Sequence, residues 1–451
     1  MCHEEEGARL IQPTLAEPLS IKRSFDTLRT MTDGQAPPFP IDVLDPRFYD
    51  DPWEAYRWLR TNAPLWWDAA NELWVVSKHE DVSHISRHQE LYSAAAGVRP
   101  KVAAPMSIIA MDDPEHTRQR RLINKGFTPR VVRKLTEHMR ELSNRIIDDI
   151  AERGECDFVQ DVAIHVPLIV IAELMGLDPD QRLRLYRWSD AMMAGDGHLD
   201  PDDPVLIAAA EAGGEFATMV FELIEARRQD GSTDDIIGIL THAYDEGELL
   251  RGGGGEPGAA LDSNDLMMFL ILLVVAGNET TRNAISGGLR ALSLFPEEKD
   301  RLLANPDLID LAVDELIRYV SPVFSFMRTV TEDHTYQGVD FKAGDRVMML
   351  YQSANRDEDV FDDADALRID RDPNPHLAFG IGTHYCLGAN LARNEVKVVF
   401  EELFKRLSDI RAADPATLTR GDSSLVLSLE TLPAVFTPES QREREKEGVP
   451  G

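Results

Sequence analysis

The chain has 451 residues, 43% of them hydrophobic, and a formal net charge of −32 at pH 7. A chain of this length and apolar content can bury an extensive core, and its negative charge argues against nucleic acid or an anionic membrane surface as a partner. The three cysteines, Cys2, Cys156 and Cys386, are widely separated. We therefore expect no disulfide framework and a reducing, cytoplasmic compartment.

The N-terminal segment is expected to lie outside the folded body. Residues 1–38 mix charges and prolines with few aromatic residues, which predicts a mobile extension. The segment has early acids and lacks an apolar run, so neither a signal peptide nor a membrane anchor is predicted. No Pro- or Ser-rich linker divides the remainder, and we expect one domain over 39–438 and a charged C-terminal tail over 439–451.

Hydrophobic spacing predicts a mainly α-helical domain with a small β region. Trp53, Tyr56 and Leu59 recur at helical intervals near the start of the domain. Residues 73–77 and 347–353 have the composition of strands and predict a small sheet. Most of the remaining chain is expected to be helical.

The segment MDDPEHTRQRR at 111–121 predicts a helix that begins after Asp and Pro. His116 and Arg120 are four residues apart and would lie on one face of this helix. Such side chains can bind a buried carboxylate group. A solvated helix surface is the alternative interpretation of each residue alone.

A long helix is predicted over 265–292, and it is strongly apolar until Asn278. Its uncharged run is shorter than the roughly 18 to 20 residues needed to cross a bilayer, so we expect a buried core helix. Glu279 and Thr280 lie in its middle, where an acid and a hydroxyl are costly unless they are hydrogen-bonded or functional. The alternative is a helix bent by threonines that bond to its own carbonyl groups.

Glu315 and Arg318 are three residues apart in VDELIRYVSP, which places both on one helical face. Pairs at this spacing are common on protein surfaces and contribute little there. The spacing alone therefore leaves an ordinary surface ion pair as an open interpretation.

The ten residues FGIGTHYCLG at 379–388 are the most informative of the chain. Three glycines let the backbone approach a flat macrocycle closely, and a helix is predicted from 387 to about 407. The N-terminus of that helix would favour a thiolate at Cys386 and lower the pKa of the thiol, while Phe379 would cover the sulfur from water. This arrangement suits a thiolate bound to haem iron.

The spacing of Phe379, Gly382, Cys386 and Gly388 resembles the haem-ligand signature of the cytochrome P450 family. The resemblance covers about 39–438 and implies a single-domain cytochrome P450 fold, with haem b between the long distal helix and the helix after the cysteine loop. It implies that Cys386 binds the haem iron. The other haem-binding residues that it implies are His116, Arg120, Ala276, Arg328, Phe379, Gly380, His384 and Gly388.

The sequence AGNETT at 276–281 resembles the oxygen-activation motif of this family, with Glu279 as the acid and Thr280 as the alcohol. By the same resemblance, Glu315 and Arg318 match a pair that holds together the core beneath the haem.

The family usually adds an arginine to this pair from a Pro-x-Arg-Phe-like segment. This chain has Ala366 at the usual arginine position. We expect Arg368 or Arg371 to compensate, or the network to be smaller.

The resemblance implies a haem-thiolate monooxygenase that inserts one oxygen atom of O2 into a C–H bond, with two electrons from a ferredoxin and an NAD(P)H-dependent reductase. Four segments look most like actinobacterial enzymes that hydroxylate sterol side chains and methyl-branched lipids: 152–159, 276–284, 352–361 and 374–388. The alternatives are a terpene or other small-hydrophobe hydroxylase, a peroxide-driven haem enzyme, and a non-catalytic haem carrier or sensor. Apolar residues expected to line the substrate pocket are Val98, Met106, Ile109, Val323 and Leu425.

Basic residues concentrate in two segments that lie on the proximal side of the haem in this family. An acidic [2Fe-2S] or similar ferredoxin would be steered to such a surface. A solvated helix face is the alternative. The basic residues are Arg118, Arg121, Lys125, Arg130, Arg133, Lys134, Arg393 and Lys397.

Overall fold

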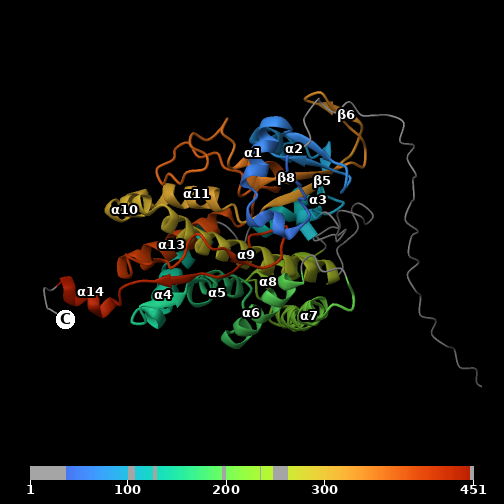
Figure 1. Ribbon diagram of the computed structural model, residues 1–451. Helices are drawn as coiled ribbons and strands as arrows, with labels where there is room; N and C mark the ends of the chain where they lie inside the picture. The colour runs from blue at the N-terminus through green and yellow to red at the C-terminus, as the bar shows by residue number, and fades with distance from the viewer. Residues whose placement is uncertain are drawn as a thin grey trace, which may run out of the picture. The chain divides into compact units, whose positions relative to one another are not determined.

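The computed structural model describes residues 37–99, 107–124, 129–195, 200–233, 235–246 and 263–446. These residues belong to one compact unit. Within it, the largest sheet lies with α1 and α2 on one side, and the longer helices pack together on the other (Figure 1).

Helices make up most of the described residues. Their bounds are α1 (Trp53–Asn62), α2 (His79–Arg87), α3 (Glu115–Ile123), α4 (Pro129–Ile150), α5 (His165–Leu174), α6 (Pro179–Ala194), α7 (Pro204–Asp230), α8 (Ile236–Asp245), α9 (Ser263–Leu294), α10 (Pro296–Ala304), α11 (Ile309–Val320), α12 (Tyr351–Ala354), α13 (Ala389–Arg406) and α14 (Glu439–Lys446). Short helical turns include η2 (Ser107–Ala110), η4 (Val159–Ala163) and η6 (Gly382–His384).

The strands are short. The largest sheet has the order β1-β2-β8-β5-β3, in which only β2 and β8 pair in parallel. Its strands are β1 (Leu65–Asp68), β2 (Leu73–Val76), β3 (Tyr92–Ser93), β5 (Ser325–Val330) and β8 (Arg346–Leu350). A second sheet has the order β4-β12-β9 and two further pairs are β6-β7 and β10-β11, with bounds β4 (Glu155–Asp157), β6 (His334–Tyr336), β7 (Val339–Phe341), β9 (Arg411–Ala412), β10 (Thr419–Arg420), β11 (Leu429–Thr431) and β12 (Pro433–Val435).

The long helix α9 contacts α5, α7, α11 and α13 and runs through the centre of the helical side (Figure 1). Two glycines let its neighbours approach closely. A Cβ atom at Gly287 would lie 2.7 Å from Cγ1 of Val320 on α11, and one at Gly288 would lie 3.0 Å from Cζ of Phe400 on α13. Glycine at both positions therefore permits α9, α11 and α13 to share one hydrophobic core.

The structure agrees with most of the predicted elements. The long helix predicted over 265–292 is α9, the helix after the cysteine is α13, and residues 73–77 contain β2. The strand predicted over 347–353 is partly wrong, because β8 ends at Leu350 and α12 follows. The Tyr351 N–H still makes a strand-like bond to the carbonyl oxygen of Phe324, which precedes β5. The Tyr351 carbonyl oxygen, however, accepts from the Asn355 N–H at 2.9 Å, which is a helical hydrogen bond.

The charged tail predicted over 439–451 includes α14. Glu439 at its start pairs with Arg406 of α13 at 2.5 Å, and Arg442 pairs with Asp409 at 2.9 Å. These ion pairs hold the start of the tail against the helical side.

Candidate active site

The loop that carries Cys386 is shaped by two glycines. Gly380 and Gly382 have φ angles of +68° and +78°, in the left-handed region that favours glycine. A Cβ atom at Gly382 would also lie 2.7 Å from the carbonyl oxygen of Ser86 in α2. The Cys386 N–H donates to the Phe379 carbonyl oxygen at 2.8 Å. This bond closes the loop and places the thiol just before α13.

The surroundings of Cys386 act on its thiol in opposite directions. Burial raises the pKa of the thiol, whereas the Gly388 N–H and the charges of Arg120 and Arg393 lower it. Burial dominates, so the pKa lies above the ordinary value of a cysteine. The helix N-terminus therefore acts in the predicted direction, but together with the two arginines it does not offset the loss of hydration.

Four nitrogen-bearing side chains gather beside this loop. The ring centroids of His116 and His384 are 4.2 Å apart. The Nδ1 atom of His116 and the Nε2 atom of His384 are buried and have no hydrogen-bond partner among the described residues. Arg120 donates to the Tyr385 carbonyl oxygen. Arg328 is buried on β5 and donates to the preceding carbonyl oxygen at 2.8 Å.

Burial keeps both imidazoles of this cluster neutral. Burial first, and then the charge of Arg328, lowers the pKa of His384 to about 2. Burial and Arg120 lower the pKa of His116, although the Asp113 carboxylate lies 3.8 Å from its Nδ1 atom. The cluster therefore combines two guanidinium groups with two neutral imidazoles. This set of donors suits anionic groups, since charge-assisted hydrogen bonds are the strong ones.

The acid and the alcohol predicted on α9 have different environments. The Thr280 hydroxyl donates to the Ala276 carbonyl oxygen at 2.7 Å, so the back-bonding alternative describes part of this geometry. Ala276 is exposed on a helix that is otherwise mainly buried, and Thr280 is half-buried. Ala276 and Thr280, one turn apart, thus form an uncovered strip on α9. Glu279 is 2% exposed and lies on another face.

Two residues that the sequence analysis missed hold the Glu279 carboxylate. Arg282 Nη2 and Asn283 Nδ2 donate to Glu279 Oε1 at 2.5 and 2.9 Å. Arg282 also lies 3.7 Å from Asp190 on α6, and the Asn283 side-chain oxygen accepts from the Leu429 N–H of β11 at 2.8 Å. Their spacing of three and four residues from Glu279 is the signal that could have identified them.

Glu315 and Arg318 form an interior pair on α11. Both are 0% exposed, and Arg318 Nε and Nη2 donate to the Glu315 carboxylate at 2.7 and 2.8 Å. The other donors of Arg318 reach carbonyl oxygens of Asn355, Ala364 and Ala366 at 2.7 to 2.9 Å. Burial excludes the surface ion pair that the spacing alone left open.

The third member of this network is Arg371. Its Nε donates to Glu315 Oε2 at 3.0 Å and its Nη1 to the Asp362 carbonyl oxygen at 2.8 Å. Arg368 contributes its backbone N–H to Glu315 Oε1 at 2.9 Å, but its side chain is 42% exposed. Arg371 therefore supplies the guanidinium that Ala366 cannot.

The predicted pocket residues lie in several segments. The Val98 carbonyl oxygen accepts from the Met327 N–H of β5 at 2.9 Å. The Leu425 carbonyl oxygen accepts from the N–H of Phe324, which follows Val323, at 2.8 Å. Ile109 is half-buried in η2, which contacts α9. Met106 lies outside the described residues. The structure thus joins Val98, Val323 and Leu425 to one end of β5.

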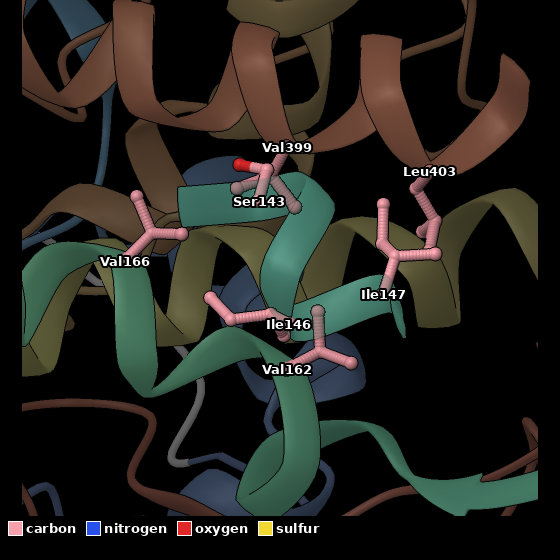
Figure 2. Close-up of a pocket in the computed structure, with 7 residues that line it drawn as sticks. All are labelled: Ser143, Ile146, Ile147, Val162, Val166, Val399 and Leu403. Atoms are coloured by element: carbon pink, nitrogen blue, oxygen red, sulfur yellow. The ribbon is translucent and has the colours of Figure 1, made fainter. Parts of the chain in front are cut away.

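A small hollow lies away from these candidates, between α4, η4, α5 and α13 (Figure 2). Figure 2 shows aliphatic side chains around Ser143, whose hydroxyl is buried and has no hydrogen-bond partner among the described residues. An apolar hollow with one unpaired hydroxyl is a packing feature. The lining residues are Ser143, Ile146, Ile147, Val162, Val166, Val399 and Leu403.

The predicted basic surface is partly neutralised. Arg393 pairs with Asp314 at 2.6 Å and Lys397 with Asp310 at 2.7 Å, both on α11. Arg118 and Arg121 are exposed on α3. Lys125 lies outside the described residues, as do the side chains of Arg130, Arg133 and Lys134.

Comparison with known proteins places this geometry in a family. The family model for cytochrome P450 matches residues 205–413. The steroid C26-monooxygenase of Mycolicibacterium smegmatis is 37% identical over 402 residues, which cover 88% of this chain and 96% of that protein. The chain belongs to the cytochrome P450 family.

Two further relatives extend this finding. The methyl-branched lipid omega-hydroxylase of Mycobacterium tuberculosis is 35% identical over 85% of this chain and 90% of its own length. The structure of Mycobacterium marinum cytochrome P450 CYP268A2 in complex with pseudoionone is 32% identical, with a TM-score of 0.78, over 89% of this chain and all of that one. The chain is therefore a cytochrome P450 monooxygenase, as the sequence analysis predicted.

The donors beside the cysteine loop fit the haem b that this family uses. The two carboxylates of haem are anionic, and His116, Arg120, Arg328 and His384 offer nitrogen atoms that can bind them. His116 and Arg328 are buried, Arg120 and His384 are half-buried, and His116 Nδ1 and His384 Nε2 have no partner among the described residues. A Cβ atom at Gly388 would meet no atom within 4 Å. The uncovered strip on α9 and the free space at Gly388 are compatible with a flat group between these elements.

Proposed function

We propose that this P450 hydroxylates the end of a sterol side chain or of a methyl-branched acyl chain, using O2 and two electrons from a ferredoxin. The observation that carries this proposal is the match to a steroid C26-monooxygenase along 88% of the chain. The match to a methyl-branched lipid omega-hydroxylase supports the same substrate class. Both of these activities fit a substrate with an extended apolar tail.

We assign the haem-binding roles to the residues beside the cysteine loop. Bound to Cys386, haem would activate O2 and transfer one oxygen atom to a C–H bond. Phe379 would shield the sulfur, and the Arg393 guanidinium, 4.5 Å from the centre of its ring, would hold the ring in place. The two arginines and two histidines beside the loop would bind the haem carboxylates and so orient the group.

We assign the supply of protons to Glu279 and Thr280. Thr280 can hold a water molecule in the distal space when its hydroxyl turns away from the Ala276 carbonyl oxygen. Glu279 is linked through Arg282 to Asp190, whose side chain is 59% exposed. Arg282 keeps its protons in a protein, so it holds the Glu279 carboxylate near the solvent-exposed Asp190 without passing protons itself. A peroxide-driven enzyme or a haem carrier would not need the acid and the alcohol.

We propose a cytoplasmic location and an acidic [2Fe-2S] or similar ferredoxin that docks at the proximal face. Arg118 and Arg121 supply exposed positive charge for such a partner. By length and composition, one described helix, α7, could cross a membrane. Core helices of water-soluble proteins pass the same criterion, and α7 carries exposed Glu211, Glu222 and Glu225, which are costly in hydrocarbon.

A spectral binding screen tests the substrate proposal. Cholestenone and a methyl-branched fatty acid should shift the resting iron towards high spin and be hydroxylated near the chain end, with a surrogate ferredoxin and reductase. A shift only with pseudoionone or other compact hydrophobes would favour the second candidate, a small-hydrophobe hydroxylase, which the structural relative bound to pseudoionone supports.

The ligand assignment has its own test. Cys386→Ala should abolish the red-shifted Soret band of the reduced carbon monoxide complex, and persistence of the band would reject Cys386 as the ligand. Haem binding and normal reduction without turnover of any compound would favour a carrier or sensor. Turnover with peroxide alone, at the rate seen with electrons, would favour a peroxide-driven enzyme.

A further inference from the structure

One residue at the end of α11 has a strained backbone that the roles proposed above do not explain. Ser321 has a φ angle of +44°, in the left-handed region that residues other than glycine adopt at a cost. It is 1% exposed and directly precedes Pro322 and Val323. Backbone strain of this kind persists only where the surroundings hold it. The contacts of Ser321 therefore show what the strain maintains.

The Ser321 hydroxyl is held from two sides. It donates to the Arg318 carbonyl oxygen at 2.8 Å and accepts from Asn355 Nδ2 at 2.7 Å. Asn355 is 0% exposed, and its side-chain oxygen accepts from the Leu377 N–H at 2.6 Å. The Gly380 N–H in turn donates to the Leu377 carbonyl oxygen at 2.8 Å. The Asn355 side chain thus joins the end of α11 to the segment that leads into the cysteine loop.

The turn after Ser321 contains part of the predicted pocket wall. Val323 pairs with Val426 in an antiparallel bridge, and the Phe324 N–H donates to the Leu425 carbonyl oxygen at 2.8 Å. Because these contacts tie the two segments together, a shift of the turn would move Val323 and Leu425 together. The backbone of Ser321 therefore sets the position of two wall candidates.

We propose that Ser321 and Asn355 are positioning residues that determine which carbon of the substrate is oxidised. This inference rests on the proposed function, in which Val323 and Leu425 line the pocket and Cys386 binds the iron. The Ser321–Asn355 bond joins this wall to the cysteine loop, so it fixes how far the bound chain lies from the reacting centre. Reaction at a chain end depends on this distance, because a terminal methyl C–H bond is stronger than the tertiary C–H bond at the neighbouring branch carbon. A wall that moves lets the weaker bond react.

The first test asks whether the two side chains act together in the folded chain. Urea unfolding of Ser321→Ala, Asn355→Ala and the double variant forms a cycle that isolates their interaction. The losses in the single variants should not add, because each variant removes the same hydrogen bond. Additive losses would mean that the two side chains act independently, which overturns the inference. If Asn355→Ala does not fold, the Ser321 variants in the second test decide.

The second test measures the ratio of branch-carbon to terminal alcohol formed from cholestenone, together with the high-spin fraction at saturating cholestenone. Ser321→Ala and Ser321→Gly both remove the hydroxyl, whereas only glycine adopts the left-handed backbone at little cost. In both variants the ratio should rise about 3- to 10-fold, the range expected for loss of one hydrogen bond. The high-spin fraction should fall because the chain end is held less closely. If Ser321→Gly keeps both wild-type values, the serine only ends a helix and the inference is wrong.

Ser293→Ala is the matched control. The Ser293 hydroxyl has the same pattern of bonds, since it donates to the Leu289 carbonyl oxygen of its own helix at 2.7 Å and accepts from the Ala412 N–H at 2.9 Å. It joins α9 to β9 and not to the turn before Val323. The variant should keep the product ratio and the high-spin fraction of wild type. Changes equal to those in Ser321→Ala would mean that loss of any such serine loosens the site, which contradicts the specific role.

The two proposals fail in distinguishable ways. If wild type neither shifts towards high spin nor forms product with cholestenone or a methyl-branched fatty acid, the proposed substrate class is wrong, and the ratio of products from pseudoionone then decides on Ser321. If wild type hydroxylates the chain end and the Ser321 variants keep its product ratio, only the positioning role is wrong. If wild type forms no product from any of these compounds, both proposals are wrong.

Discussion

Replacing Arg371 by methionine tests the interior ion network at the point where the resemblance implies an arginine and this chain has Ala366. Arg371 makes one charge-assisted bond to Glu315, worth about 1.5 to 3 kcal/mol, and one bond to the Asp362 carbonyl oxygen, worth about 0.5 to 1.5 kcal/mol. Its contact with the Asp363 carbonyl oxygen, at 3.5 Å, is too long to add much. Arg318 still pairs with Glu315 in the variant. The loss should therefore be about 3 kcal/mol, at the low end of the roughly 3 to 5 kcal/mol for breaking a buried pair.

Urea unfolding followed by tryptophan fluorescence measures this loss, and haem content after purification shows whether the site beneath the haem is affected. Arg368→Met is the matched control. Its side chain is 42% exposed and only its backbone N–H reaches Glu315, so a change within about 0.5 kcal/mol is expected. Equal losses in Arg368→Met and Arg371→Met, or a loss below about 1 kcal/mol in Arg371→Met, would refute the reasoning.

Three further substitutions test separate parts of the structure. Thr280→Ala should bind substrate normally but divert electrons to hydrogen peroxide. The ratio of hydrogen peroxide to product should rise about 10- to 100-fold, for a relative barrier change of about 1.4 to 2.8 kcal/mol. An unchanged ratio would show that Thr280 does not supply protons. Gly287→Ala should lower the melting temperature because its Cβ atom would meet α11 at 2.7 Å. Gly214 is at an exposed position of α7 with free space around it, so Gly214→Ala should gain up to about 1 kcal/mol; equal effects would contradict the packing argument. Ser143→Ala should raise unfolding stability by about 1 kcal/mol because it removes a buried, unpaired hydroxyl, and destabilisation would mean that the hydroxyl has a partner such as water.

The sequence was sufficient to predict the two helices that carry the site. Periodicity and composition indicate α9 and α13, and the glycines around Cys386 predict its loop. The choice between Arg368 and Arg371 could not be predicted, because it depends on which side of a turn each side chain leaves the backbone.

The net direction of the Cys386 pKa shows a related limit. The sequence identified one group that lowers the pKa, the N-terminus of the helix after the loop, but not the contributions of Arg120 and Arg393. It could not show how strongly burial opposes them, because burial depends on how all the surrounding segments cover the thiol. In the folded chain, burial outweighs the groups that lower the pKa. A sequence pattern can show which groups are near one another, but it shows less well how far each group is removed from water.

The surface charges around the cysteine loop lead to a last prediction, on electron transfer. The sequence analysis counted Arg393 and Lys397 as basic surface, but each is paired with an aspartate of α11. The whole chain carries −32, so an acidic ferredoxin is repelled at long range and attracted only near cations such as Arg118. Raising the ionic strength from about 0.01 to about 0.15 M shortens the screening length from about 30 to about 8 Å. Reduction of the haem, followed by stopped flow, should therefore first accelerate with salt, and Arg118→Gln should slow it most at low salt. A rate that only falls with salt would mean that local attraction outweighs the net charge at every distance.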